Sequence, residues 1–166
     1  IVYLADFYGI SLNQGKQELT IREEFRLLES YMKIQQVRFG DGIELEYDLD
    51  ESLLEHKVMK LTLQPIVENS IHHGRRDDSD SFHILIRLYR TEEQSALQKT
   101  VLEVIDDGIG IPPEKMLELQ DSMDQSVGGY GLKNVNLRIK LQYGQEYGIS
   151  MESEEGFGTK VRIELP

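Results

Sequence analysis

The sequence predicts an α+β fold: a two-layer sandwich in which helices cover one face of a mixed, mostly antiparallel sheet. Several segments alternate apolar and polar residues, as strands do when one face is buried and the other is wet. Other segments repeat apolar residues at helical spacing, which gives each helix one apolar side to pack on the sheet. A doubly wound parallel sheet is therefore not expected.

The first two predicted elements are helices. Residues 1–13 are apolar and mildly helical, like the end of a helix that starts before Ile1. Thr20 opens the next helix because Thr20 and Glu23 form a capping-box pair. This second helix is amphipathic and is expected to end near Phe39.

The later elements follow from the same two periods. Pro65 is tolerable in the first turn of a helix, and Gly74 can stop that helix. In order we expect a strand at 43–47, a helix at 61–73, strands at 82–88 and 101–105, a loop with one short helix at 112–128, a helix at 131–142, and strands at 149–151 and 161–165.

Composition narrows the possible functions. The chain has 166 residues, which fits one domain or one domain with an appendage, and a net charge of −12. That charge argues against a general nucleic-acid binder and against binding to anionic membranes, but not against a small anionic ligand. The absence of Cys excludes disulfides, Cys-based zinc sites, iron–sulfur clusters and Cys nucleophiles. The start at Ile1 rather than Met indicates a piece of a longer protein.

Four segments could carry chemistry. In the first, Asn69, His72 and His73 lie three and four positions apart on the helix at 61–73, so with Glu68 they form a polar stripe able to reach a metal–phosphate group. A solvated helix face is the alternative. A zinc site is disfavoured because adjacent His side chains on a helix diverge and no third soft ligand is near.

The second segment is IDDGIGIPP, which begins at Ile105. Asp106 ends a buried strand and is followed by Gly108 and Gly110, which permit a sharp turn or a close approach to a ligand. A buried carboxylate needs hydrogen-bond donors, and a ligand amine can supply one. An ordinary Asp-Gly turn is the alternative, and a Ca²⁺ loop would need more regularly spaced oxygen ligands.

The third and fourth segments are rich in glycine. The third, GGYGLKN from residue 128 on, precedes a helix whose free N–H groups suit a phosphate, or it is simply a flexible loop. Neither a Walker pattern nor a Rossmann pattern is present. The fourth, GFGT at 156–159, joins the last two strands and alone indicates a hairpin turn.

Taken together, these segments resemble a known family. The set LQPIVENSIHHG, DDGIGIPP, GGYGLKNVNLRI and EEGFGTKVRIELP resembles the ATP-binding boxes of the GHKL superfamily, and in detail the bacterial sensor histidine kinases of the LytS/YesM type. The segment LTIREEFRLLESYMKIQQVRFGD is similar to the helix that precedes the ATP domain in that type. The resemblance covers essentially the whole chain.

The resemblance implies roles for individual residues. Asn69 matches the asparagine that binds Mg²⁺ between the phosphates, preceded by Glu68, and His72 and His73 match positions near the phosphates and beside the nucleotide. Adenine recognition is implied for four further residues, of which Asp106 would accept a hydrogen bond from the adenine amino group: Asp106, Gly108, Gly110 and Thr159. The glycine box at the base of the ATP lid is matched by Gly129, Gly131, Leu132 and Asn134.

The chain also departs from the family pattern. Pro65 stands where hydrolysing members place a glutamate as general base, which disfavours an ATPase. Asp107 stands where the family more commonly has an asparagine, directly after the aspartate that binds adenine. The phosphoacceptor motif, a His beside Pro and Phe, is missing, so the acceptor is expected upstream of Ile1.

The resemblance therefore implies the catalytic, ATP-binding domain of a two-component sensor histidine kinase. Residues 1–19 would be the end of a dimerisation helix and a turn, and residues 20–166 the ATP-binding domain. ATP and Mg²⁺ would be bound, and the γ-phosphate would pass to a His on the protein's own dimerisation helices, as a homodimer, and then to a response regulator. No nucleic acid and no direct membrane contact are expected of this cytoplasmic part of a membrane-anchored bacterial protein. The alternatives are a GHKL ATPase or serine kinase that drives a conformational switch, and an interaction module without nucleotide.

Overall fold

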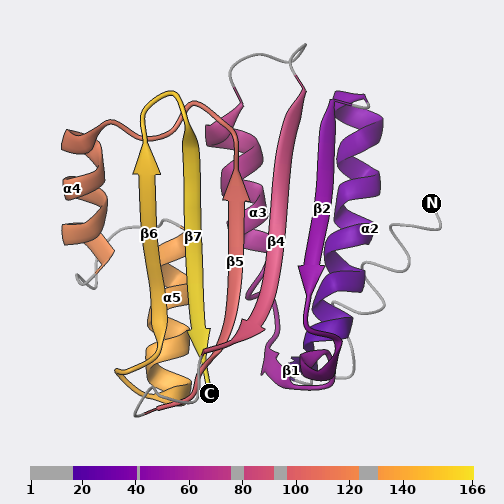
Figure 1. The fold of residues 1–166 in the computed structure, drawn as a ribbon, viewed down its shortest axis with the longest axis vertical. Helices are drawn as coiled ribbons and strands as arrows, with labels where there is room; N and C mark the ends of the chain where they lie inside the picture. The colour runs from indigo at the N-terminus through magenta and orange to yellow at the C-terminus, as the bar shows by residue number, and fades with distance from the viewer. Residues whose placement is uncertain (1–16, 41, 76–80, 92–96, 124–130) are drawn as a thin grey trace.

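A computed structural model gives the fold of the chain (Figure 1). It describes residues 17–40, 42–75, 81–91, 97–123 and 131–166. A five-stranded sheet has the strand order β2-β4-β5-β7-β6. The β2–β4 pair is parallel and the other three pairs are antiparallel. The helices α2, α3 and α5 lie on one face of this sheet, so the predicted two-layer α+β sandwich is confirmed (Figure 1).

The strands of the sheet and the helices that pack beside them occupy most of the predicted places. The strands are β2 (Ile43–Leu49), β4 (Phe82–Arg90), β5 (Thr100–Asp106), β6 (Gly148–Glu154) and β7 (Gly158–Leu165). The helices are α2 (Ile21–Phe39), the short 3-10 helix η2 (Glu51–Leu53), α3 (Gln64–Asn69), α4 (Pro113–Met123) and α5 (Gly131–Tyr143). Within the described part, none of the helices combines the length and hydropathy that a bilayer span needs.

Helix α2 begins where its capping box predicts. The Glu23 backbone N–H donates to Thr20 Oγ1 at 3.2 Å, and the Thr20 backbone N–H donates to Glu23 Oε2 at 2.8 Å. Just before the helix, β1 (Glu18–Thr20) pairs with β3 (Lys57–Met59) in a small antiparallel sheet. That pair was not predicted, because three residues are too few to show an alternating pattern. The expected helix at 1–13 lies outside the described residues.

The predicted helix at 61–73 starts too early, whereas its expected stop at Gly74 is confirmed. Leu61 has a positive φ of 58°, which is not a right-handed helical conformation, so the α-helix can begin only after Leu61. The α-helical part α3 covers only Gln64–Asn69. A π-helical turn, η3 (Ser70–Gly74), continues it. A π-turn widens the helix and redirects the side chains that follow, and such turns occur often at functional sites.

The core lies between the helices and the sheet. Residues on the helix-facing side of the central strands, among them Ile84, Ile86, Leu102, Val104 and Ile163, are almost fully buried. They contact the apolar sides of α2, α3 and α5 in one continuous cluster. This cluster fixes the helices over the sheet, and with them the polar residues at the ends of β5 and α3.

The open face of the sheet carries a row of charges rather than isolated polar residues. Glu103 of β5 is only 4% exposed there. Its carboxylate accepts a hydrogen bond from the Tyr89 hydroxyl at 2.8 Å and lies 3.5 Å from Arg87 Nη1. Arg162 approaches from the other neighbouring strand at 3.9 Å, and Arg87 also pairs with Asp48 of β2. Acidic and basic side chains thus alternate across four neighbouring strands, in the order Asp48, Arg87, Glu103 and Arg162.

Candidate functional site

The centre of the candidate site is Asp106, the last residue of β5. It is 5% exposed, and its Oδ1 accepts hydrogen bonds from the backbone N–H of Gly108 at 3.0 Å and of Thr159 at 3.2 Å. The Ser70 side chain also donates to this carboxylate. Burial raises the pKa of Asp106, while these donors oppose the rise without cancelling it. Asp106 is therefore a buried acceptor, held in place by groups from β7 and η3.

The glycines beside Asp106 allow protein segments to pack closely. The Ile109 N–H donates to the Gly74 carbonyl oxygen at 2.7 Å, and a Cβ on Gly108 would lie 2.3 Å from the same oxygen. Gly110 has φ +67°, and its Cβ would lie 1.9 Å from the Glu154 carbonyl oxygen. Neighbouring backbone leaves no room for a Cβ at either glycine, a reason that adds to the expected sharp turn or close approach to a ligand.

Thr159 lies directly opposite Asp106 in the β5–β7 register. Its hydroxyl is 2.8 Å from Ser153 Oγ, and Ser153 Oγ donates to the Gly158 carbonyl at 2.9 Å. Because Ser153 has only one hydroxyl proton, Thr159 must be the donor in their contact. The Ile111 N–H donates to the same Ser153 oxygen, so these hydroxyls join the β6–β7 hairpin to the loop after Asp106.

Asp107, next in the chain, is exposed and faces a different partner. The backbone N–H of His83 donates to Asp107 Oδ1, and the His83 ring Nδ1 lies near Oδ2, both at 2.9 Å. The hydrogen bond to Asp107 raises the pKa of His83. Burial would raise the pKa of Asp107, but the contacts with His83 outweigh it and lower that pKa. Two adjacent aspartates thus have different surroundings, and the buried one is Asp106.

Helix α3 and the turn η3 carry the predicted phosphate-side residues. Glu68 and Asn69 are half-buried at the end of α3, and Glu68 Oε1 accepts a hydrogen bond from Gln64 Nε2 at 2.8 Å. His72 and His73 lie in the π-turn and are exposed. Ser70, the next residue after Asn69, is buried by contrast.

The start of α5 lies next to the start of α3. A Cβ on Gly131 would lie 3.8 Å from Pro65 Cβ, an ordinary van der Waals distance. Leu132 is half-buried and Asn134 is exposed. Gly129 lies outside the described residues. The structure thus brings the first residues of α5 to the helix that carries Asn69.

Three residues that hold the site were missed by the sequence analysis. The Ser70 side chain donates to Asp106, and the Gly74 carbonyl oxygen accepts the Ile109 N–H. Ser153 joins Thr159 to the loop after Asp106. Each acts through a contact between segments distant in sequence, and periodicity carries no signal for such contacts. A glycine directly after the two histidines was visible, but it indicated only a helix stop.

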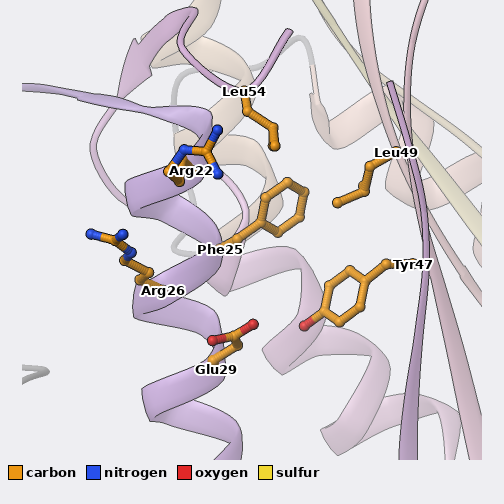
Figure 2. A pocket seen from close by; sticks show the side chains of 7 residues that line it. All are labelled: Arg22, Phe25, Arg26, Glu29, Tyr47, Leu49 and Leu54. Carbon is orange, nitrogen blue, oxygen red and sulfur yellow. The ribbon is translucent and has the colours of Figure 1, made fainter. Parts of the chain in front are cut away.

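A separate hollow of about 300 Å³ lies between α2 and β2 (Figure 2). Phe25 and Tyr47 meet edge to face in it, with ring centroids 5.6 Å apart. Burial, together with the charge of Glu29, raises the pKa of Tyr47 to about 12. Its lining contains none of the predicted site residues: Arg22, Phe25, Arg26, Glu29, Tyr47, Leu49 and Leu54.

Known proteins that match nearly the whole chain include two staphylococcal relatives. An "uncharacterized sensor-like histidine kinase" of Staphylococcus epidermidis is 31% identical over 169 residues, which cover 100% of this chain and 32% of that protein. Sensor protein kinase HptS of Staphylococcus aureus is 30% identical over 98% of this chain and 31% of its own length. The chain thus spans about a third of the length of these curated relatives.

Solved structures show the same fold. The catalytic domain of histidine kinase ThkA matches with a TM-score of 0.63 at 18% identity, covering 90% of this chain and 94% of that one. The histidine kinase domain from Erythrobacter litoralis EL346 blue-light activated histidine kinase matches with a TM-score of 0.60 at 19% identity, over 99% of this chain and 71% of that one. ThkA in complex with response regulator protein TrrA also matches, with a TM-score of 0.60 at 18% identity, over 99% of this chain and 47% of that one.

Two family descriptions match the chain in succession. Residues 1–43 match the histidine kinase family. Residues 56–166, which are most of the chain, match the family described as histidine kinase-, DNA gyrase B-, and HSP90-like ATPase. The chain therefore belongs to the histidine kinase-, DNA gyrase B- and HSP90-like ATPase family, and it is an ATP-binding domain.

Proposed function

We propose that this chain is the catalytic domain of a sensor histidine kinase, which binds Mg-ATP and presents its γ-phosphate to a histidine upstream of this domain. The observation that carries the proposal is the buried Asp106, a fixed acceptor at the end of β5. Support comes from the relatives, which are sensor kinases by name, and from the family of the domain.

Asp106 would recognise adenine through its amino group. A carboxylate offers about four lone-pair sites. The contacts from Ser70, Gly108 and Thr159 use three of them, which leaves one for a ligand donor. An amino group fits that site because an ionised carboxylate can only accept, whereas the ring carbonyl of guanine would meet it acceptor to acceptor.

Asn69, with Glu68 nearby, would bind the magnesium ion. Mg²⁺ prefers oxygen ligands and usually keeps several waters, so few protein ligands suffice beside the phosphates. Among the residues that the structure describes, no group of three or more His, Cys, Asp or Glu side chains could hold a metal. A metal here would therefore arrive with the nucleotide, because phosphate oxygens must complete its coordination.

The residues at the start of α5 would face the phosphates. Transfer of a phosphoryl group depends mainly on positioning and on neutralising charge. Free N–H groups at the start of a helix suit a phosphate, and Gly131 leaves room for close approach. His72 and His73 are exposed on the turn η3 and would lie toward the phosphates and the nucleotide. Pro65 has no side-chain base to activate water, which favours transfer over the alternative, hydrolysis.

The same proposal extends to the whole protein. Residues 1–19 would be the end of a dimerisation helix, and residues 20–166 the ATP-binding domain of a homodimeric, membrane-anchored bacterial kinase with this part in the cytoplasm. A response regulator would receive the phosphate. The ThkA structure supports this partner class, since its title names a complex with the response regulator protein TrrA.

Titration calorimetry of the chain with ATP, with Mg²⁺ or with EDTA, tests nucleotide binding. Asn69→Ala should remove the gain in affinity that Mg²⁺ provides, while binding of metal-free ADP stays nearly unchanged. An equal loss of metal-free ADP affinity would show that Asn69 is structural.

Radiolabelling tests the direction of transfer. With γ-labelled ATP, this chain alone should remain unlabelled, because no histidine in it has the family's acceptor context. A longer chain that includes the upstream segment should gain acid-labile, base-stable label, since transfer needs donor and acceptor held together. Phosphate release into water without any label on the longer chain would instead support the ATPase alternative.

A further inference from the structure

Glu24 is a buried carboxylate that lies outside the predicted site. It belongs to the first turn of α2 and is 2% exposed. Burial raises the pKa of Glu24. The hydrogen bonds that Glu24 accepts from backbone N–H groups oppose this rise only in part. Because a buried carboxylate is unfavourable without donors around it, the partners of Glu24 indicate what it does.

Three consecutive backbone N–H groups converge on this carboxylate. Leu61 N–H donates to Oε1 at 2.7 Å, and the N–H groups of Thr62 and Leu63 donate to Oε2, each at 3.0 Å. Consecutive N–H groups that point to one place form an anion-binding concavity. Leu61 is also the one non-glycine residue with positive φ in the described part of the chain, a conformation that side chains disfavour. The carboxylate therefore stabilises an otherwise unfavourable turn.

Arg138 of α5 binds the same turn from the carbonyl side. Its Nη2 donates to the Lys60 carbonyl at 2.5 Å, and its Nη1 donates to the Leu61 carbonyl at 3.4 Å. Arg138 lies about two helical turns beyond Gly131, on the helix whose start faces α3. The turn at 60–63 is thus joined to α2 by Glu24 and to α5 by Arg138, and it leads directly into α3.

We propose that Glu24 is a positioning residue: by holding the turn at 60–63 it fixes the direction of α3, and so the place of Asn69 relative to the start of α5. The inference rests on the proposed function, in which Asn69 meets the metal and α5 meets the phosphates. Helix α3 begins at Gln64 and ends at Asn69, so a tilt of the turn moves Asn69 with it. Two of the three hydrogen bonds to Asp106 come from the sheet and from its own loop, and one comes from Ser70, directly after α3, so adenine recognition should depend less on Glu24 than metal binding does.

The test compares two buried carboxylates. Glu24→Gln keeps one acceptor oxygen but turns an amide donor toward backbone N–H groups. Glu103→Gln is the matched control, because Glu103 is also a buried carboxylate but lies on the open face of the sheet. ATP affinity of the chain is measured by calorimetry with Mg²⁺ and with EDTA, and thermal unfolding is recorded for each variant.

We expect Glu24→Gln to lower the affinity for Mg-ATP about tenfold or more, a loss typical of changing a residue that orients a metal ligand, while the affinity in EDTA changes little. Glu103→Gln should lower the unfolding temperature without changing the ratio of the two affinities. A double variant with Asn69→Ala should lose no more of the Mg²⁺ gain than Asn69→Ala alone, because Glu24 acts through Asn69.

Two results would overturn the inference: an equal fall of both affinities in Glu24→Gln, or additive losses in the double variant. If Glu24→Gln does not fold, Arg138→Met loosens the turn from α5 and should give the same loss confined to Mg-ATP. An unchanged ratio in that variant would also overturn it. Failure of the wild-type chain to bind ATP, or of Asn69→Ala to affect the Mg²⁺ gain, identifies the proposed function itself as wrong.

Discussion

Replacing Asp106 with asparagine should weaken ATP binding sharply without unfolding the domain. The asparagine oxygen can still accept the N–H groups of Gly108 and Thr159, which now bind Oδ1. Its amide nitrogen then occupies the other position and presents a donor to the adenine amino group. A mispaired buried polar group costs about 1–3 kcal/mol, which corresponds to a loss of roughly tenfold to a hundredfold in affinity.

The fold should tolerate this change because the charge of Asp106 is not stabilising at neutral pH. Burial raises its pKa in the folded state, so its contribution to stability is greatest at low pH and falls as the pH rises through that raised pKa. A neutral amide avoids this loss. We therefore expect the unfolding temperature of Asp106→Asn at pH 7 to equal or exceed that of the wild type.

Calorimetry with ATP, and displacement of bound ATP by GTP, measure the effect. Asp107→Asn is the control, because that neighbouring carboxylate is exposed and bonds to His83 instead. It should change the dissociation constant for ATP by less than about twofold, as surface substitutions usually do. If GTP displaces ATP as well as ATP itself does, or if both variants bind ATP normally, then Asp106 does not recognise the base.

Three further predictions concern stability. Gly110→Ala should destabilise by at least about 2 kcal/mol in urea unfolding, since its Cβ would overlap a backbone carbonyl of the β6–β7 turn. Gly156→Ala, with positive φ but open space, should cost clearly less, and equal losses would contradict the packing argument. Thr20→Ala should cost about 0.5–2 kcal/mol through loss of the helix cap, and an unchanged urea midpoint would refute the role of the cap. The contact with Asp107 raises the pKa of His83, so its stabilisation is present below the ordinary His pKa and is lost as the pH rises through the raised value. His83→Gln should therefore lose more stability at pH 6 than at pH 9, and an equal loss at both would refute this.

The sequence correctly predicted the helices and strands whose positions depend on residues close to one another in the chain. The capping box of Thr20 and Glu23 marks the true start of α2, and alternation marks β4 and β5. The start of α3 was misplaced because it depends on Glu24, a residue 37 positions away from Leu61 that fixes the turn before the helix. A periodic pattern contains no information about such a distant contact.

In the candidate site, too, the sequence identified the residues with a local signal and missed those that act through distant contacts. Asp106 stood out because a carboxylate at the end of an apolar strand is unusual, and the structure places it in a buried position. Its partner Ser70 could not be identified, since nothing near Ser70 in the sequence indicates a contact with the end of β5. The glycines were recognised as special, but their reason, close backbone packing against Gly74 and Glu154, required the three-dimensional arrangement.

The row of charges on the open face of the sheet has a consequence for how the chain selects its strand pairing. Arg87, Glu103 and Arg162 lie opposite one another in register across β4, β5 and β7. A slip of β5 by one residue would turn its side chains to the other face and place Glu103 among the apolar residues under the helices. An unpaired charge buried there costs several kcal/mol, so the shifted arrangement is rejected as the strands assemble. Glu103 therefore contributes to the accuracy of folding, beyond what its ion pairs add to the stability of the finished sheet.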